Sequence, residues 1–171
     1  MCNALPLGIR IEAEAIPPVA EHTEYVAAGA ISVGVEYRVL TDVIVDGNYA
    51  GGDSQSTIDA ARPATLDDEG VSLHVCDAET GAEYLRFDAF HEDPHYHYIH
   101  PGEYQQIIVF DTTACGDMLE FSLECLRSRL PQMLEHAGAS ELAARLDVDV
   151  VHDAMARIAE LARTASRAGV R

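Results

Sequence analysis

The feature that most constrains the fold is a change of hydrophobic period near residue 117. Before it, apolar and polar residues alternate in short stretches, most clearly from Ile31 to Val39. After it, apolar residues recur every three or four positions. A period of two is typical of half-buried strands, and a period near 3.6 is typical of amphipathic helices. The sequence therefore predicts an α+β fold: an antiparallel meander of about five or six strands, followed by two or three C-terminal amphipathic helices.

We expect residues 1–171 to form a single domain, mainly β over 1–111 and helical over 117–168. The strand that starts at Ile31 is interpreted as continuing through 43–45 to a turn at 46–48. Residues 50–69 are rich in Gly, Asp, Ser, Ala and Thr and are interpreted as a long acidic loop, with one helical turn at 57–62 as an alternative. The other expected strands are 9–13, 71–75, 83–90, 95–100 and 105–111.

The helical part carries its own boundary signals. Asp117, with Glu120 three residues later, resembles a capping box. Pro131 should kink or split the first helix, and Gly138 should end it. A last helix from about residue 149 places Ile158 and Leu161 on one apolar stripe.

The charge of the chain excludes some classes of partner. It has 11 basic residues against 29 acidic ones, a net charge of -18. Such a field repels phosphate backbones, so no nucleic-acid partner is expected. No apolar run is long enough to span a bilayer, and the N-terminus lacks the pattern of a signal peptide, so we expect a cytoplasmic protein with no membrane partner. A protein partner, or a second copy bound through the C-terminal helices, stays open.

Four of the eight histidines lie within a single run of thirteen residues, His91–Glu103. If 85–90 and 95–100 are antiparallel strands joined by a four-residue turn, Phe90 faces His95 and Asp88 faces His97. Side chains directly opposite share a face. One face then collects Arg86, Asp88, Phe90, His95, His97 and Ile99, and the other collects Leu85, Phe87, Ala89, Tyr96 and Tyr98, with His100 at the end.

This register predicts a candidate divalent-metal site with His95, His97 and Asp88 as ligands, Asp88 serving either as third ligand or to orient His97. Glu103, beyond the strand end, could complete the set. A nitrogen and oxygen donor set of this kind suits zinc, iron, manganese or nickel, and no other cofactor is predicted.

Two alternatives remain open for the same residues. In the first, the polar face is solvated or hydrogen-bonded and has no chemistry. In the second, a metal-free catalytic site uses His97 as a base held by Asp88, with Arg86 as an anion clamp.

Other reactive residues are weaker candidates. Tyr96 and Tyr98 lie with apolar neighbours and are interpreted as core aromatics. His74 and His152 are expected on the surface. The four cysteines show no Cys-x-x-Cys pairing, and Cys115 is interpreted as a buried thiol rather than a nucleophile.

Two resemblances involve the same segment. Arg86-Phe87-Asp88 and Pro94-His95-Tyr96-His97 resemble elements of the small toxins of the TumE-like toxin–antitoxin class. As a whole, the chain resembles small uncharacterised bacterial families that share a Pro-His-Tyr-His-Tyr core. The hypotheses are therefore a metal-binding protein of unassigned activity, a non-catalytic interaction protein that uses its acidic surface or C-terminal helices, and a toxin-like module. Whether the protein is an enzyme stays open.

Overall fold

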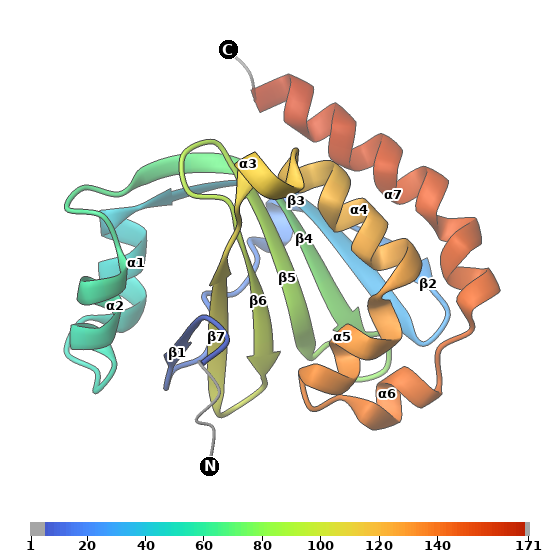
Figure 1. The fold of residues 1–171 in the computed structure, drawn as a ribbon, viewed down its shortest axis with the longest axis horizontal. Coiled ribbons are helices and arrows are strands. Elements are labelled where there is room, and N and C mark those ends of the chain that lie inside the picture. The colour runs from blue at the N-terminus through green and yellow to red at the C-terminus, as the bar shows by residue number, and fades with distance from the viewer. Residues whose placement is uncertain (1–5, 170–171) are drawn as a thin grey trace.

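The computed structural model describes residues 6–169, and over these residues it confirms the α+β class. The described residues form a seven-stranded antiparallel sheet, one strand more than the upper expectation, in the order β1-β7-β6-β5-β4-β3-β2. Apart from β1, each strand lies beside its neighbour in sequence, as a meander requires (Figure 1). The strands are β1 (Ile9–Ile11), β2 (Thr23–Ala28), β3 (Ile31–Thr41), β4 (Asp67–Asp77), β5 (Glu83–Phe90), β6 (His95–His100) and β7 (Tyr104–Val109).

The helices lie in two groups. Those after the sheet cover one of its faces, and the two between β3 and β4 lie at one end of the molecule (Figure 1). Among residues 6–169, no helix is long and apolar enough to cross a membrane. Apart from a 3-10 turn at Ala20–His22, the helices are α1 (Asp42–Tyr49), α2 (Gln55–Ala61), α3 (Thr112–Cys115), α4 (Met118–Ser128), α5 (Leu130–His136), α6 (Ser140–Ala144) and α7 (Val148–Gly169).

The boundary signals of the C-terminal part act as expected. The Asp117 carboxylate caps α4 by accepting a hydrogen bond from the amide of Glu120. Pro131 lies in the first turn of α5, so the chain breaks between α4 and α5. Gly138 ends α5 with a φ of +77°, a conformation that favours glycine.

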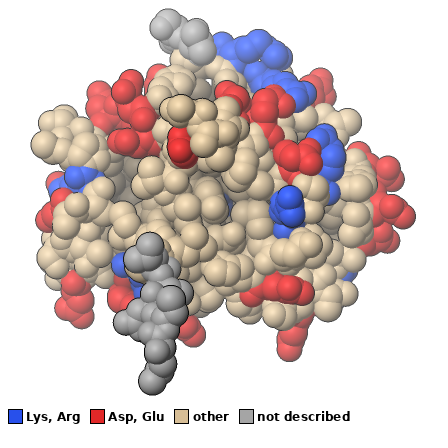
Figure 2. All heavy atoms as spheres, in the orientation of Figure 1, with Lys and Arg blue, Asp and Glu red and all other residues tan. Residues whose placement is uncertain are grey.

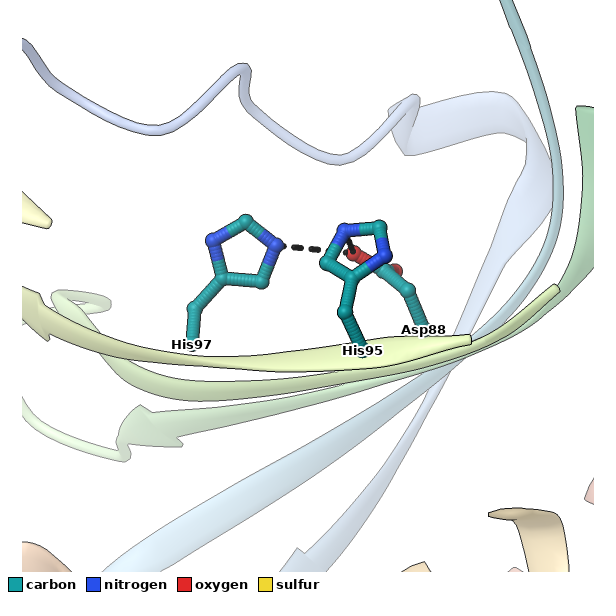
Figure 3. Close-up of side chains that lie close together, drawn as sticks. All are labelled: Asp88, His95 and His97. Carbon is teal, nitrogen blue, oxygen red and sulfur yellow. Dashed lines mark hydrogen bonds and ion pairs between the residues drawn. The ribbon is translucent and has the colours of Figure 1, made fainter. Parts of the chain in front are cut away.

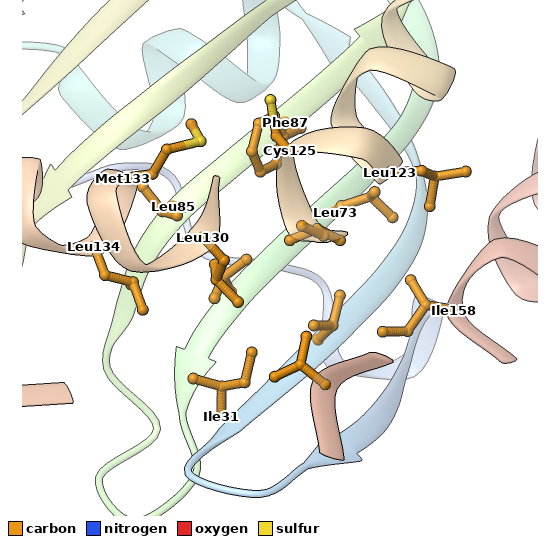
Figure 4. Packing of buried hydrophobic residues seen from close by; sticks show 14 of the residues in the cluster. Ile31, Leu73, Leu85, Phe87, Leu123, Cys125, Leu130, Met133, Leu134 and Ile158 are labelled. Atoms are coloured by element: carbon orange, nitrogen blue, oxygen red, sulfur yellow. The ribbon is translucent and has the colours of Figure 1, made fainter. Parts of the chain in front are cut away.

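The main core lies between the sheet and helices α4 to α7. Strand residues of alternate parity point into it, including Ile31, Leu73 and Phe87, and they meet apolar side chains of the helices (Figure 4). Ile158 on α7 is fully buried, and Leu161 is half-buried. The apolar stripe of the last helix is therefore used for packing within the chain.

A second, smaller apolar cluster lies on the opposite face of the sheet. It consists of Ile11 from β1, Val45 from α1, Ile58 from α2, and Leu66. Because α1 and α2 pack there, part of the sheet's second face is covered.

The surface carries charged residues of both signs. In the view of Figure 2, the larger groups of arginine atoms lie over the C-terminal helices.

The segment between β3 and β4 differs from the sequence expectation. Residues 43–45 do not continue β3 but belong to α1, where Val45 is buried against the second cluster and Val43 is exposed. The chain leaves the sheet after Thr41 because the Asp42 backbone amide and carboxylate both hydrogen-bond the backbone of Leu66. The stretch 50–69, predicted to be a loop with a possible helical turn at 57–62, contains α2, which overlaps that turn, and the first residues of β4. Strand β2 was not predicted, and it adds the seventh strand.

Candidate metal site

The candidate site lies on the sheet face that points away from α4 to α7. Because side chains alternate along a strand, the residues between the core positions of β4, β5 and β6 all point to this second face. They include a set of polar side chains that are mostly buried. Its members are Ser72, His74, Arg86, Asp88, His95 and His97, and each is less than one fifth exposed.

The predicted faces of the β5–β6 hairpin are confirmed, but its register is wrong by two residues. Asp88 pairs with His95 rather than His97, and Arg86 pairs with His97 rather than Ile99. A shift of two keeps every side chain on its face, so Arg86, Asp88, His95 and His97 still lie together. Leu85 and Phe87 pair with Tyr98 and Tyr96 on the core face.

The register differs because the connection is longer than four residues. The buried Asp68 carboxylate, at the start of β4, accepts hydrogen bonds from the amides of His91, Glu92 and Asp93. Phe90 remains paired with β4, opposite Gly70. The turn is therefore held open by a residue far from it in sequence, and local spacing does not reveal this.

Asp88, His95 and His97 converge at their tips (Figure 3). The Nε2 atom of His97 lies 3.0 Å from Asp88 Oδ2, and the Nε2 atom of His95 lies 3.3 Å from the same oxygen. The second Asp88 oxygen accepts a hydrogen bond from the Ser72 hydroxyl. One ligand atom from each of the three residues lies within 4.8 Å of the others, so the group could hold a metal ion.

The other ring nitrogen of each histidine is already engaged. His95 Nδ1 donates to the backbone carbonyl of Asp93 at 2.6 Å, because a carbonyl oxygen can only accept. His97 Nδ1 lies 2.8 Å from the side-chain oxygen of Gln105. The proton is thus placed on Nδ1 in both rings, and both Nε2 atoms are directed at Asp88.

The orientation of the Gln105 amide supports this assignment. Its nitrogen donates to the backbone carbonyl of Glu14 at 3.3 Å and to the Tyr49 hydroxyl at 3.1 Å. The Tyr49 hydroxyl in turn donates to the same Glu14 carbonyl at 2.7 Å. With its nitrogen fixed on that side, the amide presents its oxygen to His97.

The electrostatics of the three residues are coupled. Burial opposes ionisation of Asp88, but the hydrogen bonds with His95 and His97 hold the pKa of this carboxyl well below its ordinary value. Burial also opposes charging of His95, and the Asp88 carboxylate outweighs it and raises the His95 pKa. The pKa of His97 is lowered, because its burial outweighs the attraction of Asp88. The two histidines therefore differ in their response to the same carboxylate, although both lie in contact with it.

A buried ion-pair chain lies beside the three residues. Arg86 donates through Nε and Nη2 to both oxygens of Glu83, at 2.9 and 2.6 Å. The His74 ring lies between Glu83, at 2.7 Å from Nδ1, and Glu36, at 3.0 Å from Nε2. Glu36 also accepts from Arg38. These contacts satisfy the buried charges of the sheet's second face next to the candidate ligands.

His74 was predicted to be exposed, and that prediction is wrong because its side chain is fully buried. The sequence showed only that His74 points away from the core residues Leu73 and Val75. Strand β4 is central in the sheet, however, and its second face is covered by neighbouring side chains.

The stability of the protein is expected to depend on pH through His74. Burial disfavours its imidazolium, but Glu36 and Glu83 outweigh this and raise its pKa above 6.5. A raised folded-state pKa contributes stability below the unfolded value, and this contribution is lost as the pH rises through the folded value. The stability difference between wild type and His74→Gln should therefore be larger at about pH 6 than at about pH 9. Urea unfolding at both values measures it, and an equal difference would contradict the pairing.

A cavity of about 480 Å³ opens over the three candidate ligands. Its floor is the polar sheet face with Arg86, Asp88, His95, His97 and Gln105, and its walls are largely aliphatic. The N-terminal segment crosses it and is fixed through its backbone carbonyls: Glu12 accepts from Ser54, and Ile16 accepts from Arg38. The ligands thus face a partly open cavity whose rim includes this N-terminal segment.

The remaining sequence candidates lie outside the group. Tyr98 is buried in the core and Tyr96 packs against it, as predicted. Cys115 is exposed, not buried, and Glu103 is exposed in the turn after β6. His152 is exposed, and its ring contacts a backbone carbonyl of α4. The sequence did not reveal the roles of Gln105, Glu83 and Ser72. Gln105 lies in a predicted strand, and alternation along that strand could have placed its side chain on the same face as His97.

Comparison with known proteins gives a family but no activity. The model of a domain of unknown function, DUF7700, matches residues 25–162, more than half of the chain. The chain belongs to this family. The DUF7700 match includes all three candidate ligands, whereas β1 and the segment that covers the cavity precede it. Searches among curated proteins and among solved structures found no match.

Proposed function

We propose that this protein binds one divalent metal ion through Asp88, His95 and His97, with the remaining coordination positions open to the cavity. One observation carries the proposal: two imidazoles, each with Nδ1 committed to a carbonyl oxygen, direct their Nε2 atoms at one carboxylate oxygen. Metal-binding histidines usually donate their second ring nitrogen to a carbonyl or carboxylate group in this way.

The spacing of the donors supports the proposal. Donors bound to a single ion at about 2.0 to 2.2 Å lie about 3 to 3.5 Å from one another. The two measured nitrogen to oxygen distances, 3.0 and 3.3 Å, fall in this range.

The donor set limits the choice of ion. Two imidazole nitrogens and one carboxylate oxygen suit zinc, iron, manganese or nickel, and the group includes no cysteine sulfur. Three protein ligands leave positions for water or substrate, as in catalytic metal sites. A bound ion of this kind supplies Lewis-acid polarisation of an oxygen atom or a lowered pKa of a bound water.

The metal-free alternative, with His97 as a general base, has less support. Its Nδ1 atom donates to Gln105 and its Nε2 atom faces Asp88, so neither nitrogen is placed to take a proton from a substrate. Exposure of Ile158 and Leu161 would favour the interaction-protein hypothesis, but Ile158 is buried and Leu161 is half-buried. The toxin-like hypothesis stays a prediction.

Metal analysis of protein purified without a histidine tag tests the proposal. We expect about one equivalent of ion in the wild type and almost none in His95→Ala/His97→Ala, because two of three ligands are lost. The matched control is His91→Ala, an exposed histidine from the same run that should leave the metal content unchanged. Equal, substoichiometric metal in all three proteins would end the proposal.

The Gln105 side chain should matter although it touches no ion. We expect Gln105→Leu to weaken metal affinity about 10- to 100-fold, because His97 loses the acceptor that fixes its tautomer. Gln106→Leu, the neighbouring position on the opposite face, should have little effect. Competition with a chromophoric chelator measures both, and equal affinities of the two variants would show that Gln105 does not orient His97.

A further inference from the structure

The cavity gathers most of the arginines from the N-terminal two thirds of a strongly acidic chain. Only four arginines precede residue 127, and three of them, Arg38, Arg62 and Arg86, line the cavity. Their closest partner carboxylates, including Glu36 and Glu83, are not among the lining residues. The partner carboxylates therefore lie outside the lining, which includes two carboxylates of its own, Asp88 and Asp93.

Arg86 is the arginine nearest to the candidate ion. It lies directly opposite His97 in the β5–β6 pairing and two residues from Asp88, on the same face. Its Nε and Nη2 atoms are held by Glu83. Its Nη1 atom has no hydrogen-bond acceptor among residues 6–169. This atom is also absent from the fully buried unpaired atoms of these residues, so it is accessible. A rigidly held guanidinium thus presents unused donors to accessible space beside the metal ligands.

The rest of the cavity is aliphatic. Its walls include Ile11, Ile16, Leu40, Val45, Ile58 and Leu66, which come from β1, β3, α1, α2 and the intervening segments. The volume of about 480 Å³ lies within the range of small-molecule sites, about 300 to 1,000 Å³. A ligand that fits both regions has a polar end and an apolar body.

We infer that the cavity binds a small aliphatic carboxylate, with its carboxylate group between the bound ion and Arg86 and its chain against the aliphatic walls. The inference rests on the proposed metal site. The open ion position and Arg86 Nη1 offer two partners, and a carboxylate has two oxygens to meet them. The apolar body is favoured at the walls because it leaves water there.

Calorimetric titration of the full chain loaded with zinc tests the inference, with hexanoate as the probe and hexan-1-ol as its uncharged analogue. Hexanoate should bind at least about tenfold more tightly than hexan-1-ol, because its ionised group pairs with the ion and with the guanidinium group. For the same reason, hexanoate should bind at least about tenfold more tightly to zinc-loaded protein than to metal-free protein. Arg86→Gln should weaken hexanoate binding by a similar factor with its zinc content unchanged. The surface variant Arg127→Gln should behave as wild type.

The outcomes separate the two proposals. If the protein binds one equivalent of zinc but does not prefer hexanoate, the carboxylate inference is wrong and the metal site is still supported. The same holds if hexanoate binds equally to the wild type and to folded Arg86→Gln. A wild-type protein that holds no zinc overturns both. Since Arg86→Gln can destabilise the buried pair with Glu83, the comparison of hexanoate with hexan-1-ol on the wild type decides the matter if that variant does not fold.

Discussion

Asp88→Ala is expected to abolish stoichiometric metal binding and to lower the free energy of unfolding by about 3 kcal/mol. The carboxylate lies at the centre of the site: one oxygen faces both Nε2 atoms, and the other accepts from Ser72. The variant removes a ligand and leaves three buried polar groups without their partner, in a position that is 3% exposed.

Asp88→Asn separates the two effects. Its amide group can donate to an unprotonated Nε2 atom, so most of the stability should return, while the neutral side chain is a poor ligand and metal affinity should stay more than about 100-fold weaker. Asp93→Asn is the matched control, because Asp93 lines the same cavity and contacts His95 only through its backbone carbonyl. Metal affinity in Asp88→Asn within tenfold of wild type would show that Asp88 is not a ligand.

Glu83→Gln is expected to lower the free energy of unfolding by about 3 to 5 kcal/mol, because it removes one partner of a buried ion pair. In this variant Arg86, which is 3% exposed, loses its charged partner, and the fully buried His74 loses one of its two carboxylate partners. Metal affinity should change much less than in Asp88→Ala, since no ligand is altered.

The pH dependence of this effect follows from the Glu83 pKa. Burial opposes ionisation, but Arg86 and His74 lower the pKa from 4.5 to about 2. A depressed folded-state pKa contributes stability above the unfolded value, and this contribution is lost as the pH falls through the folded value. The wild type should therefore lose its advantage over Glu83→Gln between about pH 4.5 and about pH 2.

Urea unfolding followed by circular dichroism measures these stabilities, since the chain has no tryptophan. The control is Glu79→Gln, whose side chain is 78% exposed and pairs with Arg145 at the surface. Glu79→Gln should lower the free energy of unfolding by less than about 1 kcal/mol. A loss of similar size for Glu83→Gln would mean that the buried chain around Arg86 contributes little.

Residue alternation was enough to predict which side chains share the site. A strand reverses its side-chain direction at every residue, so Arg86 and Asp88 on one strand and His95 and His97 on the next were placed together. The wrong register did not matter for this result, because a slip of two preserves the faces.

What the sequence could not provide depends on contacts between distant residues. Asp68 sets the length of the β5–β6 connection from another strand. Gln105 orients His97 only because Glu14 and Tyr49, far away in sequence, fix its amide. β2 was missed because Glu24 and Tyr25 both lie exposed at the sheet edge, which weakens the alternation. The single-domain organisation of residues 1–171 stays a prediction.

X-ray absorption at the zinc edge of the zinc-loaded, untagged protein tests the metal site most directly, because it reports the atoms bound to the ion. We expect two imidazole nitrogens and further oxygen donors at about 2.0 to 2.2 Å, with no sulfur. In His95→Ala/His97→Ala, the imidazole signal should disappear. Sulfur at about 2.3 Å, or an imidazole signal that persists in the double variant, would contradict the assignment of Asp88, His95 and His97 as the ligands.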